Sequence, residues 1–287
     1  MTATSVEPSE PATEPPAGLR FRRHLGFREA MAELWQAREL IRTLVERDLR
    51  IRYKQTVLGF GWAVVGPVVF MLVFTVFFQS AGHFATAGVP YALFSYTALV
   101  PWTFFAEGVT LGSMSLISNL MLLNKVYCPR EVFPIATVIT AAFDAAVSAL
   151  VLLVLFAIYQ YPPAITTLWV PVLIALEVAF TLGVTLFASS VLIYLRDVRY
   201  VVPLAVQVGM FASPVIYGIN VIPAGLRPAY AIADPLGPII ASFRLTVLHN
   251  QPPDWGLLGL AALASAAWLT GGYALFKRLE TGIADIA

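Results

Sequence analysis

Long apolar segments separated by short polar ones make up most of the chain after residue 56. A helix that crosses a bilayer needs about 20 mostly apolar residues. Six segments fit this requirement, and they cover residues 57–79, 91–111, 132–160, 165–194, 199–219 and 257–276. The segment 234–249 is shorter and contains two prolines and an arginine, so it is predicted to be a re-entrant or interfacial helix.

The residues before the first apolar segment fall into two parts. Residues 1–18 are rich in Pro, Glu, Thr and Ser, which predicts a disordered tail, and they lack the basic start and apolar core of a signal peptide. Residues 29–48 predict an amphipathic helix lying in the membrane interface, with Trp35 at headgroup depth. Its apolar face consists of Leu34, Trp35, Ile41, Leu44 and Val45. The expected organisation is therefore a tail over 1–18, a cytoplasmic interface helix with basic residues over 19–56, and a transmembrane domain over 57–287.

Composition agrees with this pattern. Hydrophobic residues make up 59% of the chain, and only 12% of its residues are charged, against about 25% in soluble domains. The chain is thus expected to be an all-α integral membrane protein with six transmembrane helices. Its single cysteine, Cys128, excludes an intrachain disulfide framework, and three histidines far apart in the sequence give no metal-site spacing.

The distribution of Lys and Arg predicts the orientation. In the six-span layout, all the Lys and Arg residues except Arg227 and Arg244 fall on one side of the membrane. Ten of them precede residue 57. Because positive charge marks the cytoplasmic side, both termini are predicted to be cytoplasmic.

Polar and aromatic residues inside the spans suggest candidate chemistry. Glu107, Asp144 and Glu177 are costly in lipid, so each is expected to face protein or water. They could form a proton relay, but interhelical hydrogen bonding is favoured because no Lys, Arg or His lies in the same spans. In the first span, Phe70, Phe74, Phe77 and Phe78 share one helical face near Trp62. Such a stripe is usually packing or lipid-facing, but its rings could also stack on sugars along a pathway.

Enzymatic motifs are absent from the sequence. There is no GxxxxGK[ST] loop for ATP, and the GFG stretch at 59–61 opens an apolar helix rather than following a strand. Neither a Ser-His-Asp arrangement nor an HExxH motif is present. The chain is therefore expected to have no catalytic site, metal or cofactor of its own.

Four stretches, in this order, resemble one family. They are RDLRIRYKQTVLGFGWAVVGPVVFMLVFTVFF (47–78), NKVYCPREVFPIA (124–136), RDVRYVVPLAVQVGMFASPVIY (196–217) and DPLGPIIASFR (234–244). The family comprises the ABC-2 permease subunits that export cell-surface polysaccharides, including O-antigen, capsule, teichoic acid and galactan. The resemblance covers about residues 28 to 280. Two positions depart from the family's pattern, with Cys128 in place of the usual Phe and Asp234 in place of Asn.

The resemblance implies a homodimer that passes a polyprenyl-diphosphate-linked polysaccharide between its two copies. Arg50, Arg52 and Lys54 would guide the diphosphate from the cytoplasmic leaflet, since an arginine fork donates two parallel hydrogen bonds. The aromatic residues expected to face the sugar chain are Trp62, Phe70, Phe74 and Phe77. Short helices between Ile219 and His249 would close the external mouth as an outer gate pair.

The resemblance also implies two copies of a separate ATPase subunit, which bind ATP and Mg²⁺ and drive export. The loop after the second span would dock this subunit, with Asn124, Lys125, Tyr127 and Arg130 at the interface. Membrane lipid is the other expected partner, and nucleic acid is not expected. The expected location is the cytoplasmic membrane.

Two other classes of membrane protein are alternatives to a polysaccharide exporter. An ABC-2 exporter of another lipid or a drug would share the six spans, but it is not expected to carry the 124–136 stretch in this form. A membrane-embedded glycosyl- or phosphotransferase would need clustered acidic residues on a cytoplasmic loop to hold Mg²⁺. The loops predicted to be cytoplasmic offer only Glu131 and Asp197, which disfavours that class.

Overall fold

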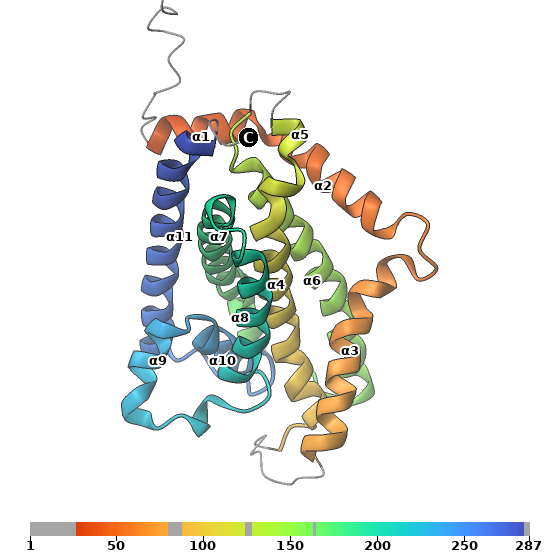
Figure 1. Cartoon of the computed structure of the whole chain (residues 1–287). Coiled ribbons are helices and arrows are strands. Elements are labelled where there is room, and N and C mark those ends of the chain that lie inside the picture. The colour runs from red at the N-terminus through yellow and green to blue at the C-terminus, as the bar shows by residue number, and fades with distance from the viewer. Residues whose placement is uncertain (1–26, 80–87, 124–127, 163–164, 284–287) are drawn as a thin grey trace, which may run out of the picture.

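The computed structural model describes residues 27–79, 88–123, 128–162 and 165–283, and the described elements are all helices (Figure 1). The tail expected over 1–18 lies outside these residues. The longer helices are α1 (Phe27–Gln36), α2 (Arg38–Tyr53), α3 (Trp62–Phe74), α4 (Tyr91–Ser118), α6 (Val132–Ile158), α7 (Val170–Tyr194), α8 (Val198–Ala212), α10 (Leu236–Val247) and α11 (Trp255–Ile283). The short ones are η2 (Gly59–Gly61), the π-helix η3 (Thr75–Gln79), α5 (Leu120–Leu123), η4 (Ile165–Trp169), η5 (Ile219–Val221), η6 (Ala224–Leu226) and α9 (Arg227–Ala233).

Four helical stretches are long and apolar enough to cross a membrane, so the chain is a multi-pass membrane protein. They are Gly59–Phe78, Val132–Ile158, Ile165–Tyr194 and Trp255–Glu280, which confirms four of the six expected spans. The other two expected spans are also helical, but they differ in character. α4 is long but less apolar than these four. The fifth expected span, 199–219, is helical only as far as Ala212. With 15 residues, α8 is about 22 Å long, against about 30 Å of hydrocarbon.

α4 forms the centre of the bundle. It packs against α3, α6, α7, α8 and α10, and most of its residues are buried. Its small residues allow α7 to approach closely, since a Cβ atom at Gly108 would lie 2.7 Å from Thr181 Cγ2. Thr185 Oγ1 also donates a hydrogen bond of 3.2 Å to the Gly108 carbonyl. α4 can therefore be less apolar than α3, α6 and α7, because protein surrounds most of it.

The expected interface helix is present as two helices. α1 and α2 meet at Ala37 and lie across the end of the bundle where α11 finishes (Figure 1). Leu44 is buried against Leu116, Phe133 and Phe276, which are close to the ends of three bundle helices. Trp35 of α1 is 71% exposed, and its place at headgroup depth stays a prediction. α2 is therefore anchored to the end of the bundle through Leu44.

α7 and α11 cross at two glycines. A Cβ atom at Gly272 would lie 2.2 Å from the Gly183 carbonyl oxygen, which is closer than any real contact. A Cβ atom at Gly183 would meet the backbone of Trp268 and Leu269 at 2.5 Å. Backbones can approach this closely only where both helices lack side chains, as is common between membrane helices.

At the end of the bundle opposite α1, α8 turns into α9 and α10 (Figure 1). Arg244 of α10 is buried and donates hydrogen bonds of 2.6–3.1 Å to the carbonyl oxygens of Phe94, Pro214, Val215 and Tyr217. Its guanidinium carbon also lies 3.6 Å from the centre of the Phe94 ring. One side chain thereby holds together α10, the start of α4 and the turn that follows α8.

Asp234, at the junction of α9 and α10, reinforces the same turn. Its Oδ2 accepts hydrogen bonds from Ser213 Oγ at 2.7 Å and from the Tyr230 hydroxyl at 2.8 Å. The Tyr217 and Tyr230 hydroxyls also donate to the Ala212 carbonyl at the end of α8. Two helices, α9 and α10, thus follow α8 and are firmly joined to it, and their role as an outer gate stays a prediction.

Candidate functional site

A cavity of about 420 Å³ lies between α3 and α8, with α4 and α6 forming its other walls. Its lining includes the rings of Trp62, Phe70, Trp102 and Phe211. Trp62 and Phe70 are 54% and 44% exposed, so their faces are open to a ligand. Polar side chains such as Gln207 lie among the rings. Apolar surfaces mixed with a few hydrogen-bonding groups are typical of small-molecule sites, which span about 300–1,000 Å³.

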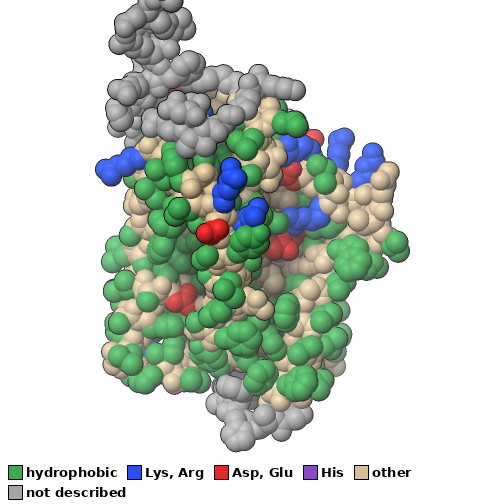
Figure 2. Space-filling view, viewed as in Figure 1, with side chains coloured by type: hydrophobic (Ala, Val, Ile, Leu, Met, Phe, Trp, Pro, Cys, Tyr) green, Lys and Arg blue, Asp and Glu red, His purple; other side chains and the backbone are tan. Residues whose placement is uncertain are grey.

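The charged residues that line this cavity are Glu107 of α4 and Asp144 of α6. Arg52, near the end of α2, bonds to both carboxylates through Nη1, with 3.2 Å to Glu107 Oε2. The Tyr53 hydroxyl donates to the other oxygen of Asp144. Figure 2 shows acidic and basic side chains close together beside the arm formed by α2 and α3, above a mostly hydrophobic surface.

This cluster was not foreseen, because the cation comes from outside the spans. No Lys, Arg or His lies within the expected spans that carry these carboxylates, so the sequence pattern shows no partner for them. α2, however, packs against α6, which brings Arg52 to both acidic residues. Two carboxylates and one guanidinium give the cluster a formal charge of −1. As placed here, Arg52 belongs to an acidic cluster and does not form an independent anion site.

Arg50 and Lys54 differ from Arg52. Both side chains are exposed, and in the described ranges neither has a side-chain partner. They lie on either side of Arg52 in the sequence, at the end of α2, and neither lines the cavity. Of the three cations expected to guide a diphosphate, the structure leaves these two available.

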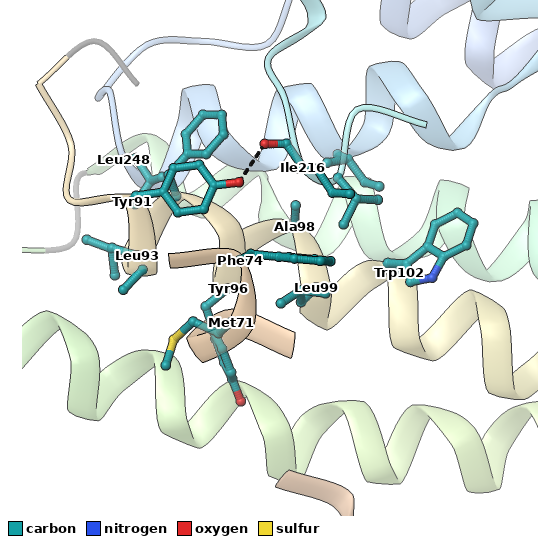
Figure 3. Packing of buried hydrophobic residues seen from close by; sticks show 14 of the residues in the cluster. Met71, Phe74, Tyr91, Leu93, Tyr96, Ala98, Leu99, Trp102, Ile216 and Leu248 are labelled. Atoms are coloured by element: carbon teal, nitrogen blue, oxygen red, sulfur yellow. Dashed lines mark hydrogen bonds between the residues drawn. The ribbon is translucent and has the colours of Figure 1, made fainter. Parts of the chain in front are cut away.

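The aromatic stripe of α3 divides into two parts. Trp62 and Phe70 line the cavity, whereas Phe74 is 6% exposed and packs in the core with Met71 and Tyr91 (Figure 3). The expectation that Phe74 faces a pathway therefore does not fit its position. Phe77 is 69% exposed but is not part of the cavity lining. Phe77 lies in the π-helix that begins at Thr75, where the spacing of side chains differs from that of the α-helical face carrying Trp62 and Phe70.

The loop after α5 is tied to the last helix. Arg130 donates to the Glu280 carbonyl at 2.8 Å, and Lys277 forms ion pairs of 2.7 Å with buried Glu131 and 3.0 Å with Glu280. Burial is the main cause that raises the pKa of Glu131, and the neighbouring Lys277 opposes it. Arg130 is thus partly engaged by the protein itself. Asn124, Lys125 and Tyr127, the other residues expected to contact an ATPase, lie outside the described residues.

Glu177 stands apart from these groups. It is 3% exposed in α7, its Oε1 has no hydrogen-bond partner among the described residues, and it does not line the cavity. The same ranges contain no group of three His, Cys, Asp or Glu residues that could hold a metal ion.

The sequence of this chain is similar to those of known transport proteins. A model of the ABC-2 type transporter family matches residues 39–248. The O-antigen export system permease protein RfbA of Myxococcus xanthus is 28% identical over 254 residues, which cover 88% of this chain and 97% of that protein. The protein of the same name from Klebsiella pneumoniae is 26% identical over 250 residues, with 86% and 95% covered. The polysialic acid transport protein KpsM of Escherichia coli is 22% identical over 245 residues, with 84% and 93% covered.

Proposed function

Since this chain belongs to the ABC-2 type transporter family, we propose that it is the permease subunit of a cell-surface polysaccharide exporter. The relatives named O-antigen export permease and polysialic acid transport protein support this reading. Two copies form the pathway, and a separate ATPase subunit supplies the free energy. The substrate is a polysaccharide linked to a polyprenyl diphosphate, and the chain lies in the cytoplasmic membrane with both termini in the cytoplasm.

The cavity between α3 and α8 is the observation that carries the proposal. Arg50 and Lys54 flank Arg52, which bonds to two carboxylates of the lining, and their exposed side chains would attract the diphosphate. Inside, Trp62 and Phe70 present exposed ring faces to a sugar. Stacking on rings depends little on the identity of each sugar, so a polymer can slide through many registers. Tight binding at every sugar would instead hold the chain in place.

Deleting the gene is expected to abolish the surface polysaccharide, and the wild-type chain should restore it. In the complemented strain, Phe70→Ala should clearly reduce surface polymer per assembled complex, since the change removes a ring face on which a sugar can stack. Leu72→Ala, a change at a 54% exposed position on the same helix, is the matched control and should be silent. Polymer is measured by immunoblot and complex by pull-down of the ATPase.

Two outcomes would contradict the proposal in different ways. Unchanged surface polysaccharide after deletion would exclude this substrate and favour an exporter of another lipid or a drug. Normal export by Phe70→Ala at normal complex levels would remove the ring from the pathway. Phe74→Ala should instead lower stability, by about 3–5 kcal/mol, because the Phe74 ring is buried in the core.

The proposed topology can be tested by cysteine labelling in a Cys128→Ser background. Single cysteines at positions 122 and 280 should react with a membrane-impermeant maleimide only after the cells are opened. A cysteine at position 226, between α8 and α9, should react in intact cells, because Leu226 is 61% exposed at the opposite end. The reverse labelling pattern would overturn the orientation.

A further inference from the structure

The charge of the cavity restricts which polysaccharide it can accept. The inference rests on the proposed function, and it concerns Glu107 and Asp144, which the proposed sugar stacking does not use. Both carboxylates line the cavity, while no Lys, Arg or His does so among the described residues. Arg52 offsets one negative charge from the edge, so the site stays acidic.

We propose that this cavity selects uncharged sugars and rejects acidic ones, with Glu107 as the main specificity-determining residue. The exporter's polymer is therefore neutral in the segment that enters first. The geometry gives the two carboxylates different roles, and each role follows from how the oxygens of that carboxylate are bonded.

Asp144 is the structural member of the pair. Its side chain is 5% exposed, and its two oxygens accept from Arg52 and from Tyr53. The ring of Tyr53 is fixed in turn by Phe60, with ring centres 4.7 Å apart. Asp144 therefore has little capacity left for a ligand, and it holds Arg52 against the cavity wall.

Glu107 is the accessible member of the pair. Its side chain is 42% exposed, and only Oε2 is bonded to Arg52. Oε1 has no partner in the described part of the chain, so it can accept a hydrogen bond from a sugar hydroxyl. Such charge-assisted hydrogen bonds are roughly twice as strong as neutral ones. The rings of Trp62 and Trp102 lie in the same lining, where they can stack on the apolar face of that sugar.

A sugar that carries a carboxylate would meet the opposite situation. Its charge would approach Glu107 in a partly enclosed site, and no cation in the lining could pair with it. At an effective dielectric constant of about 20, repulsion between like charges about 5 Å apart weakens binding more than tenfold. Uronic and sialic acids are therefore excluded, whereas neutral hexoses are accepted.

The test compares two probes of equal length on the chain reconstituted with its ATPase in lipid nanodiscs. Maltotetraose is the neutral probe, and tetragalacturonate carries one carboxylate per sugar. Binding is followed by tryptophan fluorescence, because Trp62 and Trp102 line the cavity. A Trp62→Phe variant identifies the cavity as the source of the signal. Wild-type protein should bind maltotetraose at least tenfold more tightly than tetragalacturonate.

The variants test the role of Glu107 directly. Glu107→Gln should tighten tetragalacturonate binding about tenfold and weaken maltotetraose at most about threefold, since Gln keeps the acceptor but loses the charge. Arg52→Gln should widen the preference for the neutral probe, because the cluster becomes more acidic. Glu39→Gln with Glu46→Gln removes two exposed charges from α2, away from the cavity, and should leave the preference unchanged.

Equal binding of the two probes by the wild-type protein would overturn the inference. So would a preference that Glu107→Gln does not change, or a lack of binding by either probe. Surface polysaccharide in the deletion strain tests the proposed function separately. If the permease restores surface polymer but fails these binding tests, the proposed function stands and only the proposed selectivity for neutral sugars is wrong.

Discussion

Gly272→Ala will lower the melting temperature of the purified permease by about 6 °C or more, whereas Gly271→Ala will leave it unchanged or slightly raised. The two glycines are neighbours in α11, but only Gly272 faces α7. A methyl group at 272 would lie 2.2 Å from the Gly183 carbonyl oxygen, and at 271 it would meet nothing within 4 Å. Overpacking of this kind costs typically about 1–3 kcal/mol, and the backbone obstacle places it at the upper end.

Gly271→Ala is the matched control for Gly272→Ala. Both changes raise helix propensity by about 1 kcal/mol, so any difference between the variants comes from the helix crossing alone. The measurement is a thermal unfolding curve in detergent, together with the monodisperse yield by size-exclusion chromatography. Equal melting temperatures would mean that α7 and α11 do not approach as closely as described.

Arg244→Met will cause the larger loss, about 10 °C or more in melting temperature. The arginine donates to four backbone carbonyls at the end of the bundle opposite α1, and methionine satisfies none of them. Each buried acceptor left without a donor costs about 1–3 kcal/mol. Arg244→Lys keeps the charge but lacks the planar fork, so it should restore only part of the loss.

Arg227→Met is the matched control, because it removes an arginine of α9 that makes a single backbone hydrogen bond, 3.0 Å to the Ile222 carbonyl. It should change the melting temperature by less than about 3 °C. Similar losses of melting temperature for Arg227→Met and Arg244→Met would show that α9 and α10 need positive charge in general. Full rescue by lysine would show that the fork geometry is unimportant.

The sequence predicted most of the helices, because long apolar runs are the strongest pattern that a membrane chain carries. It located α6 and α7 to within a few residues, and it distinguished the short α9–α10 pair from a span, but α11 continues to Ile283, beyond the expected end at 276. The predicted length of α8 was too great, because the apolar sequence continues from Ser213 to Tyr217. In the structure this segment is a turn, and Arg244 donates hydrogen bonds to its backbone carbonyls. A side chain 30 residues away determines that boundary, and a local pattern cannot show it.

The candidate site was predicted less completely, because it depends on where each residue of α3 points and on how distant helices pack together. Trp62 and Phe70 lie in the cavity, but Phe74 does not, because it lies one turn beyond Phe70, where α3 packs into the core beside Met71 and Tyr91. Arg52 was recognised as important, but its pairing with Glu107 and Asp144 depends on how α2 folds back onto α6. The sequence feature that could have indicated the cluster is the pair Arg52 and Tyr53, which lies where the amphipathic helix meets the first span.

The central position of α4 has a consequence for how the chain is made. During synthesis each apolar segment partitions into lipid according to its own hydrophobicity, and α4 is less apolar than the four long spans. Its buried serine and threonine side chains, among them Ser95, Thr97 and Ser113, are covered only once α6 and α7, which follow it in the chain, have packed around it. Insertion of the second span is therefore expected to lag behind its own translation and to finish only when later helices arrive. Nascent chains truncated before residue 132 should leave α4 poorly integrated and open to quality-control proteases.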